Sequence, residues 1–112
     1  MAVVFRKRSK YRNKLVRLDG LIFASKKEAN RYEELFLMQK AGLISKLEIH
    51  PQFDIVIHGF HICKVIPDFS YLSSVTGTKV VEDVKSPVSR TQLYKLKKGL
   101  MKAVLGIDVH EL

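Results

Sequence analysis

The stretch Ile66-Pro67-Asp68-Phe69-Ser70-Tyr71, followed after a turn by Val80-Val81-Glu82-Asp83-Val84-Lys85, decides the fold predicted for this chain. The two short apolar segments are joined by turn-forming residues, so they are expected to pair as the strands of a hairpin. Residues two apart share a face of a strand, so Asp83 and Lys85 project together while Val84 faces the core. Asp68 is expected opposite them on the partner strand. The hairpin therefore ends in two carboxylates and an ammonium, a group that suits a hard cation such as Mg2+.

Upstream of this hairpin, local signals predict a second hairpin and a helix. Asp19-Gly20 between apolar runs is typical of a type I′ turn, which needs positive φ at both central positions. Ser25 and Glu28 have the spacing of a capping box, and the apolar recurrence that follows predicts a helix ending near Gly42. Further extended segments are predicted at residues 47–49, 53–57 and 60–66.

Downstream, a second helix is predicted to follow the turn at residues 86–89 and to run to about Leu105, with Gly106 at its end. Its apolar stripe is expected to consist of Leu93, Leu96, Leu100, Met101 and Val104. Residues 107–110 alternate as a last short strand. The order predicts one α/β (α+β) domain over residues 1–112, a sheet with helices packed on its faces.

The positive charge is large and unevenly distributed. The formal net charge is +9, and every charged residue before Asp19 is basic. A second basic block, from Arg90 to Lys102, lies between Asp83 and Asp108 and contains no carboxylate. Clustered charge of this sign is typical of proteins that bind a polyanion, most often nucleic acid. A solvated basic surface that aids solubility is the alternative. Residues 1 to about 12 are predicted to form a basic arm that orders on a partner.

Composition argues against several other classes. One cysteine, Cys63, excludes an internal disulfide and is typical of a reducing compartment such as the cytoplasm. No apolar run is long enough to span a bilayer, and the first residues do not form a signal peptide. No Cys/His spacing typical of zinc is present. The four histidines are scattered, and we interpret each as an ordinary surface or core residue: His50, His58, His61 and His110.

Asp68, Asp83 and Lys85 match the needs of metal-dependent phosphodiester hydrolysis. That reaction needs a metal to activate water and a cation to stabilise the charge of the transition state. Asp68 and Asp83 are candidate metal ligands, the Val84 backbone carbonyl is another, and Lys85 is the candidate cation. Glu28 completes the group if the first helix packs beside the two strands. A surface ion pair is the alternative for the hairpin residues, and a capping role is the alternative for Glu28. Glu82 faces the other side and is interpreted as an outer-face charge.

These residues carry a resemblance to a known group of nucleases. Pro67-Asp68 followed by Asp83-Val84-Lys85 resembles the signature of the PD-(D/E)XK nuclease superfamily, in which a helix-borne Glu, here Glu28, often completes the site. More narrowly, the chain from Lys10 to Leu112 resembles the small phage-encoded proteins of the DUF1064 family, which are placed among such nucleases. Three blocks carry this resemblance: Asp19-Gly20 with Phe23, Ser25, Glu28, Arg31 and Tyr32, then Val81-Glu82-Asp83-Val84-Lys85, and then Tyr94-Lys95-Leu96-Lys97-Lys98.

The resemblance implies a restriction-endonuclease-like core, with a mixed central sheet of about four strands between two helices. It implies an Mg2+-dependent DNA endonuclease, with Mn2+ as an alternative to Mg2+, that acts on branched or junction DNA during phage recombination. Similar junction-resolving enzymes are homodimers. The second acid of the signature is Asp here, where many superfamily members have Glu. The shorter side chain is expected to shift the metal.

Contacts to DNA are expected from the two basic regions. Lys and Arg side chains that meet phosphates give salt-sensitive affinity without sequence information. The candidate DNA-binding residues are Arg8, Lys10, Tyr11, Arg12, Lys14, Arg90, Gln92, Tyr94, Lys95 and Lys98. Core packing is the alternative for Tyr94. A nucleic-acid-binding module that keeps the fold without catalysis is the alternative for the whole protein. No membrane contact and no small organic cofactor are predicted.

Overall fold

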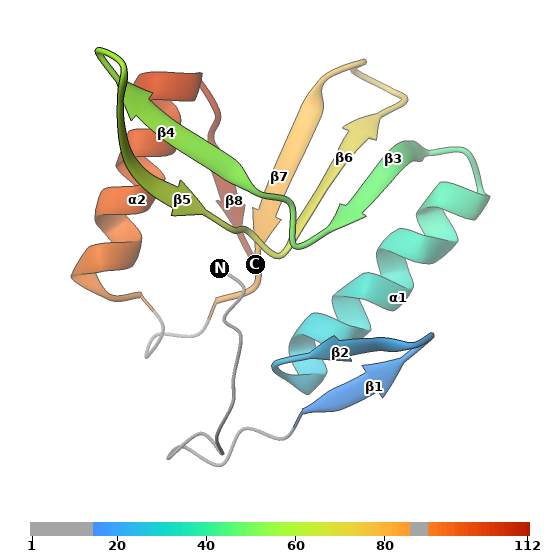
Figure 1. Ribbon diagram of the computed structural model, residues 1–112. Coiled ribbons are helices and arrows are strands. Elements are labelled where there is room, and N and C mark those ends of the chain that lie inside the picture. The colour runs from blue at the N-terminus through green and yellow to red at the C-terminus, as the bar shows by residue number, and fades with distance from the viewer. Residues whose placement is uncertain (1–14, 86–89) are drawn as a thin grey trace.

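The computed structural model describes residues 15–85 and 90–112, which form two helices and eight strands (Figure 1). The elements are β1 (Val16–Leu18), β2 (Leu21–Phe23), α1 (Lys26–Lys40), β3 (Ile44–Ile49), β4 (Phe53–Ile57), β5 (Phe60–Val65), β6 (Phe69–Ser73), β7 (Lys79–Asp83), α2 (Gln92–Leu105) and β8 (Val109–Glu111). The predicted basic arm and its DNA-binding candidates lie outside the described residues: Arg8, Lys10, Tyr11, Arg12 and Lys14. The turn predicted at residues 86–89 also lies outside them.

The central sheet contains the four strands β3, β6, β7 and β8 in that order. β3 and β7 run antiparallel to β6, and β8 runs parallel to β7, so the sheet is mixed, as expected. Two separate hairpins, β1–β2 and β4–β5, lie beside it. The predicted hairpin of β6 and β7 is confirmed, with Phe69 paired to Glu82 and Ser70 paired to Val81.

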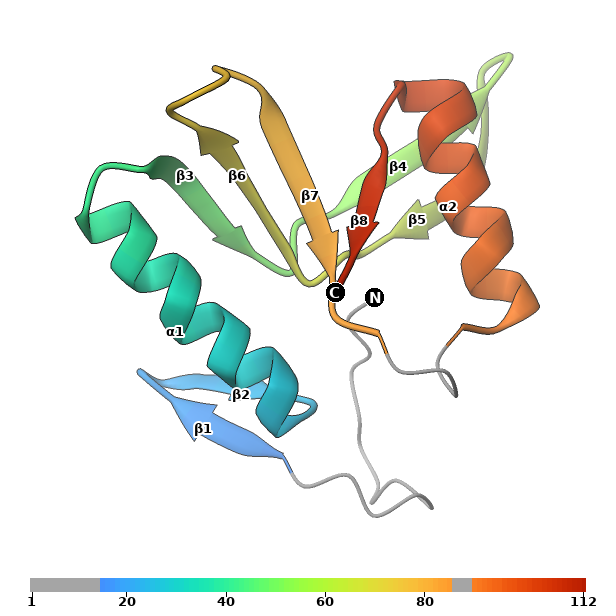
Figure 2. The same cartoon turned by 180° about the vertical axis from the view of Figure 1, so that it is seen from behind.

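The two faces of the central sheet belong to two hydrophobic cores. On one face α1 and the β1–β2 hairpin cover a core that includes Phe23, Leu35 and Phe69. On the other, α2 and the β4–β5 hairpin cover a core that includes Val81 and Met101. Seen from behind, α1 and α2 lie over different ends of the sheet (Figure 2). Successive residues of β7 therefore point into different cores, because side chains alternate along a strand.

The local signals for turns and caps are confirmed. Asp19 and Gly20 have φ of 52° and 76°, the positive values that a type I′ turn requires. The Ser25 hydroxyl accepts the Glu28 N–H at the start of α1, and Gly106 ends α2 with φ of 70°. Neither α1 nor α2, the helices of the described residues, is long and apolar enough to cross a membrane.

The predicted apolar stripe of α2 is partly wrong. Leu93 and Leu96 are each 60% exposed, whereas Met101 is fully buried as expected. Tyr94 takes the buried position in the first turn of the helix. In this first turn the ring of Tyr94 packs over Lys85, which lies two residues after β7.

Candidate metal centre

Asp68 and Asp83 meet at the end of the β6–β7 hairpin, as the alternation of the two strands predicts. The Asp68 N–H donates to Asp83 Oδ1 at 3.0 Å, and the Val84 N–H donates to Asp68 Oδ2 at 2.8 Å. The two carboxylates are 2% and 0% exposed. They are therefore not a surface ion pair, and the backbone of each strand fixes the acid of the other.

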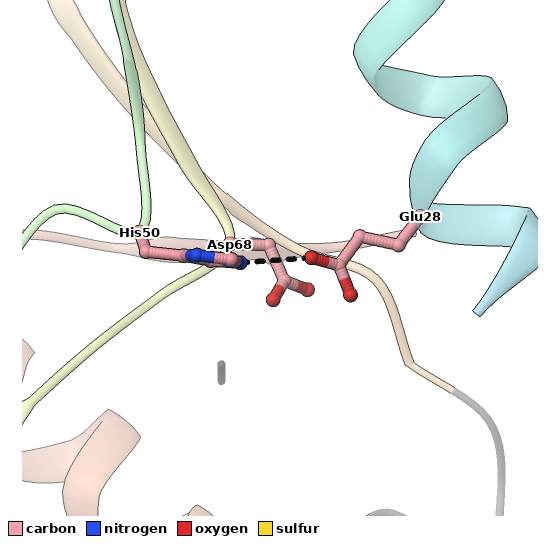
Figure 3. Close-up of side chains that lie close together, drawn as sticks. All are labelled: Glu28, His50 and Asp68. Carbon is pink, nitrogen blue, oxygen red and sulfur yellow. Dashed lines mark hydrogen bonds and ion pairs between the residues drawn. The ribbon is translucent and has the colours of Figure 1, made fainter. Parts of the chain in front are cut away.

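Glu28 reaches the same place from the first turn of α1. Its N–H is used in the cap with Ser25, but its carboxylate points away from the helix, and Oε1 lies 2.9 Å from Nε2 of His50. One ligand atom from each of Glu28, His50 and Asp68 lies within 4.8 Å of the other two. Figure 3 shows Glu28 and His50 on opposite sides of the Asp68 carboxylate. Glu28 therefore takes part in the helix cap through its backbone N–H and in the acidic cluster through its carboxylate.

His50 also belongs to this cluster, although the sequence alone led us to interpret it as an ordinary surface or core residue. It directly follows β3, and its N–H donates to the Asp68 carbonyl oxygen at 2.9 Å. The antiparallel register of β3 and β6 pairs Ile49 with Phe69, which sets His50 beside Asp68. The sequence places His50 directly after one predicted strand and Asp68 near the start of another, but the pairing of these two strands joins distant segments and comes from the structure.

Asp68 is the acid of the cluster whose proton affinity is raised by its surroundings. Burial raises the pKa of Asp68, the nearby carboxylates of Glu28 and Asp83 add to the rise, and the pKa reaches about 6. The hydrogen bond with Glu28 raises the pKa of His50. Asp68 Oδ1 is buried and has no hydrogen-bond partner within residues 15–85 and 90–112. The arrangement can therefore accept a cation between Glu28, His50 and Asp68.

Lys85 lies on the α2 side of the sheet, the side shared with Val81 and Asp83. It is 7% exposed, and its Nζ lies 4.0 Å from the centre of the Tyr94 ring. The Tyr94 hydroxyl donates to Glu111 Oε2 at 2.9 Å. Burial raises the pKa of Tyr94, with contributions from Glu111 and Asp83. Tyr94 is 4% exposed and its ring packs against Lys85, as the core-packing alternative expects, while its contact to DNA stays a prediction.

The remaining candidates for DNA binding divide into two kinds. Arg90 and Lys98 each contact Glu111, at 2.9 and 3.1 Å, because β8 brings this acid beside the basic block of α2. Gln92 and Lys95 are exposed on the first turns of the helix. The cationic side expected for α2 is therefore partly neutralised by β8.

Glu82 corrects a second expectation, because it is not an outer-face charge. It is 3% exposed and lies under α1, where Arg31 Nε and Nη2 donate to its two carboxylate oxygens at 2.8 and 2.7 Å. The Tyr71 hydroxyl also donates to it. The face opposite Asp83 is covered by a helix, so both faces of β7 bury an acid.

Comparison with known proteins gives one match. The model of a family described as "Protein of unknown function (DUF1064)" matches residues 8–106. This range contains Glu28, His50, Asp68, Asp83 and Lys85, and every element except β8. No curated protein and no solved structure matches the chain.

Proposed function

We propose that this chain, which belongs to the DUF1064 family, is a divalent-metal-dependent endonuclease that hydrolyses phosphodiester bonds in DNA. The observation that supports this most directly is the buried Asp68 carboxylate, whose Oδ1 lacks a hydrogen-bond partner among the described residues and which lies beside two further acids. Burying carboxylates together is costly unless a cation neutralises them. A divalent ion meets that need and is also what phosphodiester hydrolysis requires.

Glu28, His50 and Asp68 would hold the ion, with Asp83 and the Val84 carbonyl beside it as further candidate ligands. The hydrogen bond from Val84 N–H fixes Asp68 Oδ2 and leaves Oδ1 for the ion. When bound, the ion lowers the pKa of a water molecule and screens the charge of the phosphate. The protein itself supplies fixed ligands that cost no reorganisation during the reaction.

Lys85 would stabilise the negative charge that develops on the phosphate in the transition state. An ammonium in a water-poor site is effective in this role because the local dielectric is low. The buried aromatic ring of Tyr94, with its centre 4.0 Å from Lys85 Nζ, holds this ammonium in position. Lys85 is thus the catalytic residue and Tyr94 a positioning residue.

DNA as the substrate is supported by the net charge of +9, which favours a polyphosphate ligand. Branched or junction DNA, homodimer formation and a place in phage recombination are proposed from the resemblance to PD-(D/E)XK nucleases. Exposed Lys95 and Gln92 on α2 remain candidates for the contact to phosphates.

The deciding experiment compares cleavage of four-way, flap, nicked and linear DNA by the wild type and by Asp68→Asn, with Mg2+ or Mn2+. We expect the wild type to cut at least one substrate and Asp68→Asn to be slower by at least about 10²-fold, the scale for loss of a group that stabilises a transition state. Asp54→Asn is the matched control, since Asp54 is an exposed acid on β4.

Two outcomes would contradict the proposal. Salt-sensitive DNA binding by the wild type, without cleavage of any of the four substrates, would favour the alternative of a binding module without catalysis. Equal cleavage by the wild type and Asp68→Asn would show that the reacting centre lies elsewhere.

A further inference from the structure

His50 is fixed beside Asp68 by the backbone as well as by its ring. Its N–H donates to the Asp68 carbonyl oxygen at 2.9 Å, and its φ of 52° turns the chain sharply at the end of β3. The ring lies 6.5 Å from that of Phe23, a residue of the α1 core. These contacts hold the imidazole beside the Asp68 carboxylate, on the side opposite Glu28 (Figure 3).

A simple ion pair with Glu28 does not account for this arrangement. An ion pair would use His50 Nε2 and Glu28 Oε1, which lie 2.9 Å apart. It leaves Asp68 Oδ1 buried and without a hydrogen-bond partner in the part of the chain that the structure describes. Ligands that are neighbours on one small divalent ion lie about 3 Å apart, because metal–ligand bonds are about 2.1 Å long. The separation of Nε2 and Oε1 has that size.

The composition of the ligand set decides which ion it favours. Mg2+ takes oxygen ligands and gives up its waters reluctantly. An imidazole nitrogen instead favours first-row transition ions, whose affinity for such sites rises from Mn2+ toward Zn2+. We infer that His50 is a nitrogen ligand and that the Glu28–His50–Asp68 group binds transition divalent ions, with Mn2+ as the representative, in preference to Mg2+. This inference rests on the metal site of the proposed function, but its test does not use cleavage.

The test measures binding of Mn2+ and of Mg2+ to the wild type and to His50→Asn by titration calorimetry. Asparagine accepts a positive φ and offers oxygen in place of nitrogen, so it keeps the turn and changes the ligand. We expect the wild type to bind Mn2+ at least about tenfold more tightly than Mg2+. In His50→Asn we expect the affinity for Mn2+ to fall at least about tenfold and that for Mg2+ to change much less. His61→Asn is the matched control, because His61 also contacts an acid, Asp54, but on an exposed hairpin.

A spectroscopic measurement on the wild type makes the result independent of any variant's folding. Pulsed electron paramagnetic resonance of the Mn2+-loaded protein should detect coupling to one imidazole nitrogen, and this coupling should persist in His61→Asn. Absence of nitrogen coupling would overturn the inference. Equal wild-type affinities for the two ions, or equal losses of both affinities in His50→Asn, would also overturn it.

The outcomes separate this inference from the proposed function. Cleavage of DNA by a protein with no preference for Mn2+ would overturn the role of His50 and leave the nuclease standing. If Mn2+ binds through His50 but the protein cuts no DNA, the role of His50 stands and the proposed nuclease function is overturned.

Discussion

Glu82 and Asp68 are buried acids on opposite faces of the same hairpin, yet their surroundings differ. Glu82 accepts two hydrogen bonds from Arg31 and one from Tyr71, so its charge is compensated by the protein. Asp68 lies beside Glu28 and Asp83, and its Oδ1 has no hydrogen-bond partner in the described residues. Both acids are nearly inaccessible to solvent. Burial alone therefore does not distinguish a structural acid from one that is available to a ligand.

The difference lies in which partners the fold supplies. The network of Glu82 ties α1 to β7 and contributes to the folded state, since breaking a buried pair leaves an uncompensated charge. Around Asp68, burial and the neighbouring carboxylates of Glu28 and Asp83 instead raise the pKa of Asp68, which costs stability unless an ion is bound. Glu82 finds its partners within the chain, whereas the group around Asp68 would be completed by the proposed cation.

The largest effect in this comparison is expected from Arg31→Met. It would remove the cation that neutralises Glu82 and leave a buried carboxylate with the Tyr71 hydroxyl as its donor. We expect the free energy of unfolding to fall by about 3 kcal/mol, measured by urea titration. Arg17→Met, on the exposed side of β1, should change it little. Adding Glu82→Gln to Arg31→Met should recover part of the loss. An unchanged free energy of unfolding in Arg31→Met would show that the buried Glu82 carboxylate does not need Arg31 to compensate its charge.

A smaller effect of opposite sign is expected from Asp68→Asn in metal-free protein. The pKa of Asp68, about 6 against an ordinary 3.8, means that the native state holds this proton more tightly than the unfolded state. Stability is therefore lost as pH rises from about 4 to about 6, by roughly 2 to 3 kcal/mol, at about 1.4 kcal/mol per tenfold change in proton affinity. Asp68→Asn should be more stable than the wild type by about this amount at pH 8 with a chelator.

Urea titrations at pH 8 and near pH 3.5 would measure this gain, which should disappear at the lower pH. Asp54→Asn, at an exposed acid, should show no comparable gain at either pH. Destabilisation by Asp68→Asn at pH 8 would mean that the acid is structural after all, like Glu82.

The smallest effect concerns the ring that holds Lys85. Tyr94→Leu removes the aromatic face over the ammonium, a contact worth about 1 to 2 kcal/mol when desolvated. We expect kcat for DNA cleavage to fall about tenfold, at 1.4 kcal/mol per factor of ten, with KM little changed. Tyr94→Phe keeps the ring and should keep most of the activity. If kcat falls equally in both variants, the hydrogen bond from the Tyr94 hydroxyl to Glu111, and not the aromatic ring, is what supports activity.

Local features of the fold could be predicted from the sequence, because their causes are local. The Asp19-Gly20 turn, the Ser25 cap and the Gly106 helix end each depend on the conformational preference of one or two residues. The convergence of Asp68 and Asp83 was also predictable, since a hairpin fixes its own register.

Features that depend on which element covers which face could not be predicted in the same way. Glu82 was assigned to solvent because nothing near it in the sequence indicates that α1 packs there with Arg31. His50 was overlooked because the pairing of β3 with β6 joins distant segments. Tyr94, rather than Leu93, faces inward because the first turn of α2 meets a lysine. Long-range packing decides all three positions.

The candidate centre draws its members from separate parts of the chain: α1, the residue after β3 and the residue before β6. An unfolded polypeptide has no such preformed chelate, so an ion would bind almost solely to native molecules and shift the folding equilibrium by mass action. At a hundredfold excess over the dissociation constant this linkage contributes about 2.7 kcal/mol. The ion proposed for hydrolysis would thus also stabilise the native fold, because it would link α1 to the ends of β3 and β6.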